Sequence, residues 1–149
     1  ELYENAADTV RRRRERQADL PDPEQFLDRG ELSDCLCDAE MEVYRTGVSR
    51  GERSRMTLRL ASRMRCAGYD EHEAEDLLLA WNERNQPPER EPEVRRVVRV
   101  AYDARTPYMH GCGTGQDDPP GTRAVFEACP YEDRKQCPTY SRFSRMRAE

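Results

Sequence analysis

The sequence predicts an all-α fold, in which a small helical bundle is followed by a loop-rich segment near the C-terminus. Apolar residues recur at helical spacing between residues 54 and 102, and no segment alternates apolar and polar residues as a strand would. Residues 107–140 are rich in glycine, proline and aspartate, and they hold three of the six cysteines. A segment of this length without an apolar core needs another source of order.

The predicted elements begin with a polar helix over residues 1–18, which carries the basic run 11–14 and ends at Pro21 and Pro23. We expect residues 1–31 to form a linker helix and connector, and residues 32–149 to form the main domain. A second helix is predicted to start after a Ser33 cap, with Cys35 and Cys37 in its first turn and Leu36, Val43 and Tyr44 along it.

A third helix is predicted from Ser54 to Ala67, after a turn over residues 47–51, with Gly68 as its cap. Its apolar residues and its arginines recur at intervals of four along two adjoining sides. The apolar set is Met56, Leu60 and Met64, and the basic set is Arg55, Arg59 and Arg63.

Two further helices have clear start signals. Asp70 and Glu73 have the spacing of a capping box, and Pro92 suits the first turn of a helix. Pro87 and Pro88 separate the two helices. The expected core positions are Ala74, Leu77, Leu78 and Trp81 in the first helix and Val94, Val97, Val98, Ala101 and Tyr102 in the second.

Composition limits the class of protein. Hydrophobic residues make up 36% of the chain and charged residues 37%, so the core is thin and the cysteines are candidates for additional stabilisation. No apolar run is long enough for a membrane span and no signal-peptide pattern opens the chain, so we expect an intracellular, cytoplasmic protein with no membrane partner. The chain opens on Glu1, which favours a segment of a longer protein.

Positive charge is concentrated in one stretch of an otherwise acidic chain. The net charge is −5, which excludes a generally basic nucleic-acid binder, but residues 44–69 hold seven arginines and a single acid, Glu52. Such a stretch can bind phosphate, because the guanidinium fork donates two hydrogen bonds. Alternatively, these arginines form a solvated face that pairs with Glu52, Glu71 or Glu75.

The cysteines favour a metal centre over disulfides, because nothing indicates secretion. There is no CxxC pair, and two cysteines precede proline, as is common around iron–sulfur ligands. We predict Cys112, Cys129 and Cys137 as ligands because they lie in the loop-rich segment. Cys35 is the favoured fourth ligand and Cys37 the alternative, while Cys66 is expected to pack in the core.

The order of these motifs resembles the iron–sulfur domain of the archaeal and eukaryotic DNA primase large subunit, and the related C-terminal domain of fused primase-polymerases. The resemblance begins at the LSDCLC motif and continues through residues 51–85 to HGCG. It ends with EACPY, 17 positions after Cys112, and with QCPTY. Gly51 and Ser54 stand where that family has a histidine in its phosphate motif.

The resemblance implies an accessory domain without catalytic residues of its own, which joins a primase catalytic domain or subunit. It would bind a nucleoside triphosphate and a single-stranded DNA template, and thereby let a primer start. The implied cofactor is an iron–sulfur cluster, of the 4Fe-4S type, with zinc as the alternative. The candidate nucleotide contacts are Arg50, Arg53, Arg55, Arg59, Tyr108 and His110.

Two other classes of function remain open from the sequence. One is a zinc-stabilised DNA-binding module of a replication protein that has no role in initiation. The other is a redox enzyme, which is disfavoured because no cofactor fingerprint and no convincing pair of catalytic carboxylates occurs in the chain.

Overall fold

The computed structural model describes residues 20–23, 36–106, 108, 122–131 and 136–138. The helices within these residues are α4 (Asp38–Thr46), α5 (Arg53–Cys66), α6 (Glu71–Asn82), α7 (Glu91–Asp103) and α8 (Arg123–Ala128). The same residues contain no β-strand, only an isolated parallel bridge between Ser49 and Gln86. The predicted all-α class is therefore confirmed for the described part, and the polar helix predicted over residues 1–18 lies outside it.

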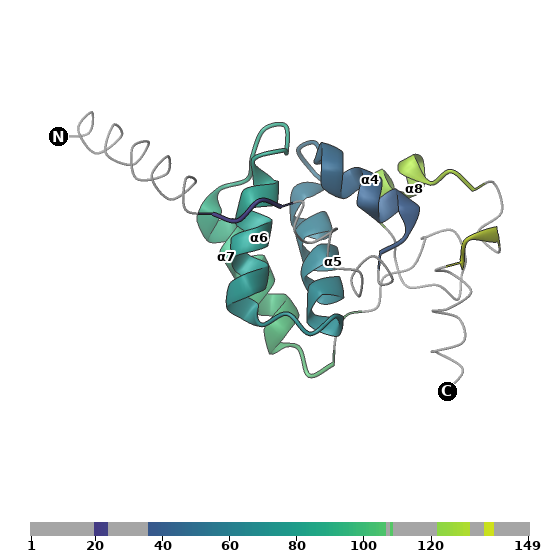
Figure 1. The fold of residues 1–149 in the computed structure, drawn as a ribbon. Helices are drawn as coiled ribbons and strands as arrows, with labels where there is room; N and C mark the ends of the chain where they lie inside the picture. Colours follow the sequence, from purple (N-terminus) through teal and green to yellow (C-terminus); the bar gives the residue numbers. More distant parts are fainter. Residues whose placement is uncertain (1–19, 24–35, 107, 109–121, 132–135, 139–149) are drawn as a thin grey trace, which may run out of the picture.

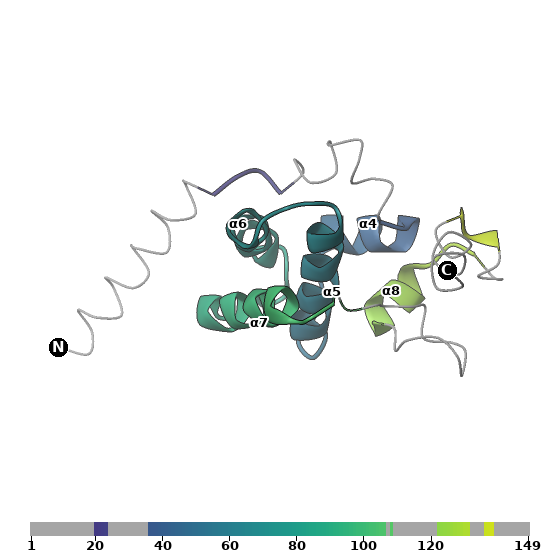
Figure 2. The same ribbon diagram turned by 90° about the horizontal axis from the view of Figure 1, so that it is seen from below.

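Helices α5, α6 and α7 pack against one another, and α4 packs against α8 (Figures 1 and 2). Helices α5 and α7 run in the same direction. Ser54 at the start of α5 donates to Glu93 at the start of α7 (3.3 Å), and Arg65 at the end of α5 donates to the carbonyl of Ala101 (2.9 Å). The N-terminal ends of α5 and α7 consequently lie at the same end of the bundle.

The caps of α5 and α6 agree with the predicted boundaries. Gly68 has a φ of +94°, a left-handed conformation that suits glycine, and the amide of Tyr69 returns to the Met64 carbonyl (3.0 Å). The side chain of Asp70 accepts a hydrogen bond from the Glu73 amide (2.8 Å), while the Glu73 carboxylate accepts one from the Asp70 amide. This reciprocal pair is the predicted capping box.

Helix α4 starts later than predicted. Its N-cap is Cys37, not Ser33, so Cys37 precedes the first turn. The Cys37 sulfur accepts a hydrogen bond from the Glu40 amide (3.4 Å), and the Glu40 carboxylate accepts one from the Cys37 amide (3.0 Å). A thiol thus occupies the position where serine or aspartate usually caps a helix, and a rule based on those residues misses it.

The core consists of one apolar cluster to which α4–α8 all contribute. The predicted apolar positions of α5, α6 and α7 are buried, except Tyr102, which is half-buried. In α4, Tyr44 is fully buried and its ring stacks on that of Trp81 (centroids 6.3 Å apart, 2° between planes). Sequence periodicity therefore located this core correctly.

Part of the segment predicted as loop-rich is helical. Helix α8 occupies Arg123–Ala128, and its Val125 is buried in the common core. Neighbouring glycines and prolines obscured this short helix in the sequence. Residues 109–121, which include Cys112 and His110, lie outside the described residues.

No described helix combines the length and the apolar character that crossing a membrane requires.

Candidate functional site

Two of the predicted surface arginines are buried inside the fold. Arg59 and Arg63 both donate through Nε to Oε2 of Glu40, at 2.7 and 3.1 Å. Arg59 is 2% exposed, Arg63 3% and Glu40 0%. We call these three residues the Glu40 triad. It joins α4 to α5, and its arginines pair with Glu40 rather than with the partners considered from the sequence (Glu52, Glu71 and Glu75).

The triad keeps Glu40 ionised. Burial by itself would raise the pKa of the Glu40 carboxyl, but the charges of Arg59 and Arg63 outweigh burial and lower this pKa to about 2. Sequence inspection did not single out Glu40, although a signal was present. Glu40 lies three residues before Val43 and four before Tyr44, on the apolar stripe of α4. A charged residue on such a stripe indicates a buried partner.

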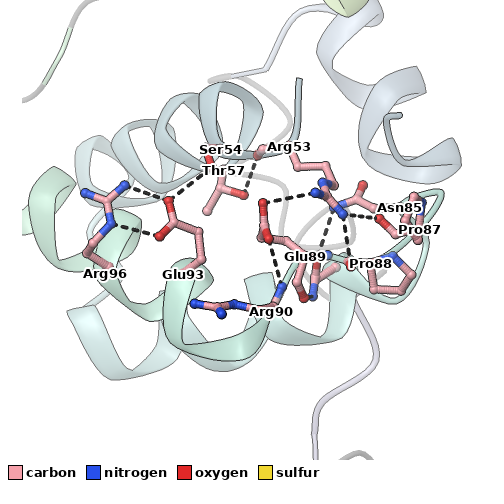
Figure 3. A network of polar contacts seen from close by, with 11 residues as sticks. Arg53, Ser54, Thr57, Asn85, Pro87, Pro88, Glu89, Arg90, Glu93 and Arg96 are labelled. Atoms are coloured by element: carbon pink, nitrogen blue, oxygen red, sulfur yellow. Dashed lines mark hydrogen bonds and ion pairs between the residues drawn. The ribbon is translucent and has the colours of Figure 1, made fainter. Parts of the chain in front are cut away.

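Arg53, one of the candidate nucleotide contacts, points into the loop between α6 and α7 (Figure 3). Its Nη1 donates to the carbonyls of Pro87 (2.8 Å) and Pro88 (3.0 Å), and its Nη2 lies 3.3 Å from Oε2 of Glu89. Its side chain is 13% exposed. Arg53 therefore holds the entry to α7, and these donors are used within the fold.

Asparagine side chains complete this loop. Asn82 and Glu89 exchange two hydrogen bonds, from Asn82 Nδ2 to the Glu89 carbonyl (2.7 Å) and from the Glu89 amide to Asn82 Oδ1 (2.8 Å). Asn85 donates to Asn82 and accepts from the amide of Val48 (2.9 Å). Both asparagines are buried. The loop that precedes α7 is thus fixed on several sides.

Arg50 and Arg55 remain as exposed candidates for phosphate binding. They flank the N-terminus of α5, where the N-cap Glu52 makes no capping hydrogen bond through its side chain and the first turn contains no acid. Within the described part of the chain, neither arginine has a side-chain partner. A helix N-terminus with unused amides favours an anion, and nearby guanidinium groups add to this preference.

The other predicted contacts are placed differently. Tyr108 lies among the residues that the structure describes. It is 41% exposed, so a base could stack on its ring. His110 lies outside the described residues.

The described cysteines differ in their exposure to solvent. Cys66 is exposed at the last residue of α5, so the expectation that it packs in the core is wrong. Cys37 and Cys129 are half-buried against the core cluster, and Cys137 is buried. Cys35 and Cys112 lie outside the described residues.

Tyr131 lies near the other three cysteines, Cys37, Cys129 and Cys137. Its hydroxyl donates to Asp38, the neighbour of Cys37 (3.0 Å), and its carbonyl accepts from the Cys129 thiol (3.8 Å). The hydrogen bond to Asp38 is the main cause of a raised pKa of Tyr131, and the nearby Cys137 and Cys129 contribute. Among the described residues, however, no three metal-binding side chains are close enough to hold an ion.

The Cys37 thiol is held in its neutral form in this arrangement. Burial is the main cause of its raised pKa, and the negative charge of Glu40 adds to the shift. A metal ion at Cys37 would therefore have to displace a proton, which makes binding weaker at low pH.

This geometry defines a helical domain whose polar contacts mainly fix its own loops. Residues 43–105 match the model of the family described as Primase C terminal 1 (PriCT-1). The match runs from the middle of α4 to the turn after α7, and it supports a primase C-terminal domain with a role in DNA replication. Cys37, Cys129 and Cys137 lie outside the matched residues. No curated protein and no solved structure matches the chain.

Proposed function

We propose that this chain is the accessory C-terminal domain of a DNA primase and that it helps a primer start by binding the triphosphate of the initiating nucleotide. The observation that carries the proposal is the open N-terminus of α5, flanked by the exposed Arg50 and Arg55, within residues that match a primase C-terminal family. Starting a primer requires two free nucleotides to meet, so a domain that holds one of them lowers the entropic barrier.

The same surface suits a triphosphate better than it suits duplex DNA. Two arginines and the first amides of one helix can contact a few phosphate oxygens, whereas a chain with a net charge of −5 repels a long polyanion. Tyr108 offers an exposed ring on which a template base could stack. We expect a primase catalytic domain or subunit to supply the metal-binding carboxylates.

Replacing Arg50 and Arg55 by alanine should impair initiation selectively. Each lost charge-assisted hydrogen bond to phosphate should weaken binding of the initiating nucleotide about tenfold to a hundredfold. The measurement compares primer initiation with extension of a supplied primer, using the primase that contains this chain.

The matched control is Arg99→Ala, because Arg99 is exposed on α7 and lies outside the shared N-terminal end of α5 and α7. It should leave both activities near wild type. Equal losses of initiation and extension in the Arg50 and Arg55 variants would contradict the proposal, and so would no loss at all. Loss of DNA binding with normal initiation would favour a DNA-binding module instead.

We also propose that Cys112, Cys129 and Cys137, with Cys35 or Cys37, hold an iron–sulfur cluster or a zinc ion. The packing of α8 against α4 and the contacts of Tyr131 support this proposal, because they bring the surroundings of Cys37 and Cys129 together. A bound centre would tie α4 to the segment that follows α7. Thiolates are suitable ligands for either group.

Cys129→Ser and Cys137→Ser should each lose most of the bound metal and lower the melting temperature. Iron, sulfide and zinc analysis of protein purified without oxygen measures the effect and distinguishes the two cofactors. Cys66→Ser is the control, because Cys66 is exposed at the end of α5. Full metal content in both the Cys129 and Cys137 variants would rule out this ligand set. Comparing Cys35→Ser with Cys37→Ser identifies the remaining ligand.

A further inference from the structure

The connector at residues 20–23 is seated on the helical core. Leu20 packs against the core cluster, and the Tyr44 hydroxyl donates to the carbonyl of Pro23 across 21 positions of sequence (2.6 Å). In both views this short described segment passes over α6 (Figures 1 and 2). The contact thus joins residues 20–23 to α4, which contributes to the same core as α6.

The anchor itself is rigid. Tyr44 is fully buried, stacks on Trp81 and has the guanidinium of Arg84 over its ring (5.8 Å from the ring centre). Arg84 also donates to the Tyr44 carbonyl (3.1 Å). A buried hydroxyl needs a hydrogen-bond partner, so the Pro23 carbonyl satisfies a requirement of the core.

The connector is also suited to docking at low entropic cost. Pro21 and Pro23 restrict its backbone before it docks, so less conformational freedom is lost than for a flexible segment. Leu20 supplies apolar area next to the hydrogen-bonded end. Restricted backbone, apolar contact and buried hydrogen bond all favour a single docked position.

We propose that residues 20–23 form a strap that docks on Tyr44 and fixes where the preceding part of the chain leaves this domain. The functional part of this inference rests on the proposed role in primer initiation. A docked strap shortens the free linker to a catalytic partner, and the length of a free linker sets the effective concentration at which two linked domains meet. Release of the strap should therefore slow primer initiation, in which both domains take part. Extension of a supplied primer should stay near normal.

The test uses Tyr44→Phe, which removes the hydroxyl and keeps the ring on Trp81. Tyr102→Phe is the matched control, because the Tyr102 hydroxyl donates to the Tyr69 carbonyl (2.7 Å) within the helical bundle and does not reach the strap. Leu20→Asp provides a second variant that weakens the strap without altering a helix. Trp81, the only tryptophan in the chain, reports on the covered core through acrylamide quenching.

Tyr44→Phe and Leu20→Asp should both raise quenching of Trp81 and lower initiation. For Tyr44→Phe the expected loss of initiation is about twofold to tenfold, the factor for one lost hydrogen bond. Tyr102→Phe should leave quenching and initiation unchanged even if its melting temperature falls equally. Unchanged quenching in both strap variants would overturn the docked strap. Raised quenching with normal initiation would overturn its positioning role. Quenching is measured without substrate, so it is independent of whether Arg50 and Arg55 bind nucleotide.

Discussion

Glu40→Ala is expected to lower the free energy of unfolding by about 3–5 kcal/mol, because it leaves two buried guanidinium groups without their shared carboxylate. Arg59 and Arg63 are almost fully buried and both donate to the same oxygen of Glu40. Urea unfolding of the variant and of the unchanged chain measures the difference.

Two controls separate the buried charge from other effects. Glu42→Ala removes an exposed carboxylate from the same helix and should change stability by no more than about 0.5 kcal/mol. Glu40→Gln keeps the size of the side chain but removes its charge and replaces one of the two acceptor oxygens by an NH2 donor. It should therefore still destabilise strongly. A loss below about 1 kcal/mol in both Glu40 variants would contradict the ion-pair assignment.

The triad also predicts acid sensitivity. The pKa of Glu40 is about 2 in the folded protein, below its ordinary value of 4.5, so the ionised form stabilises the fold above pH 4.5. That contribution, about 3 kcal/mol by linkage, is lost as the pH falls from 4.5 towards 2. Glu40→Gln should lack this part of the pH dependence.

The triad connects the helical core to the proposed cysteine centre. Glu40 Oε1 accepts from the Cys37 amide while Oε2 accepts from Arg59 and Arg63, so one carboxylate orients the N-cap of α4 and anchors that helix to α5. If Cys37 is a ligand, the triad holds the backbone of that ligand in place. Loss of Glu40 should then weaken metal retention as well as stability.

Local signals in the sequence predicted α5, α6 and α7 well, because their caps and apolar stripes involve residues within one or two turns. The capping box of Asp70 and the glycine at 68 are examples. The roles of the arginines depend on residues far away in sequence. Arg59 meets Glu40, 19 positions earlier, and Arg53 meets Pro87, 34 positions later. Periodicity identifies a helix face but does not identify the partner on another helix.

The close approach of two loops at Gly47 is another feature that sequence could not reveal. Gly47 was predicted as part of a turn, and it ends α4 with a φ of +78°. The amide of the next residue, Val48, donates to the Asn85 side chain, and the Val48 carbonyl accepts from Gln86 (3.0 Å). These contacts hold the backbone at Gly47 against the start of the α6–α7 loop, at Arg84 and Asn85.

Gly47→Ala should therefore destabilise the domain by about 2–5 kcal/mol, the sum of a left-handed backbone cost and a steric cost. The new Cβ would collide with the carbonyl group of Arg84 and lie 2.9 Å from the amide nitrogen of Asn85. Both obstacles are backbone, which cannot rotate away as a flexible side chain could. The collision could be relieved only if the hydrogen bonds of Val48 with Asn85 and Gln86 were broken.

Gly51→Ala is the matched comparison, because Gly51 also has a positive φ (+99°) and its Cβ would meet no described atom within 4 Å. It should cost only the left-handed penalty of about 1–2 kcal/mol. The difference between the two variants, measured by urea unfolding, isolates the loop contact. Equal losses would show that the two loops can separate freely. A larger loss at Gly47 would show that this junction, which also contacts the loop held by Arg53, resists separation.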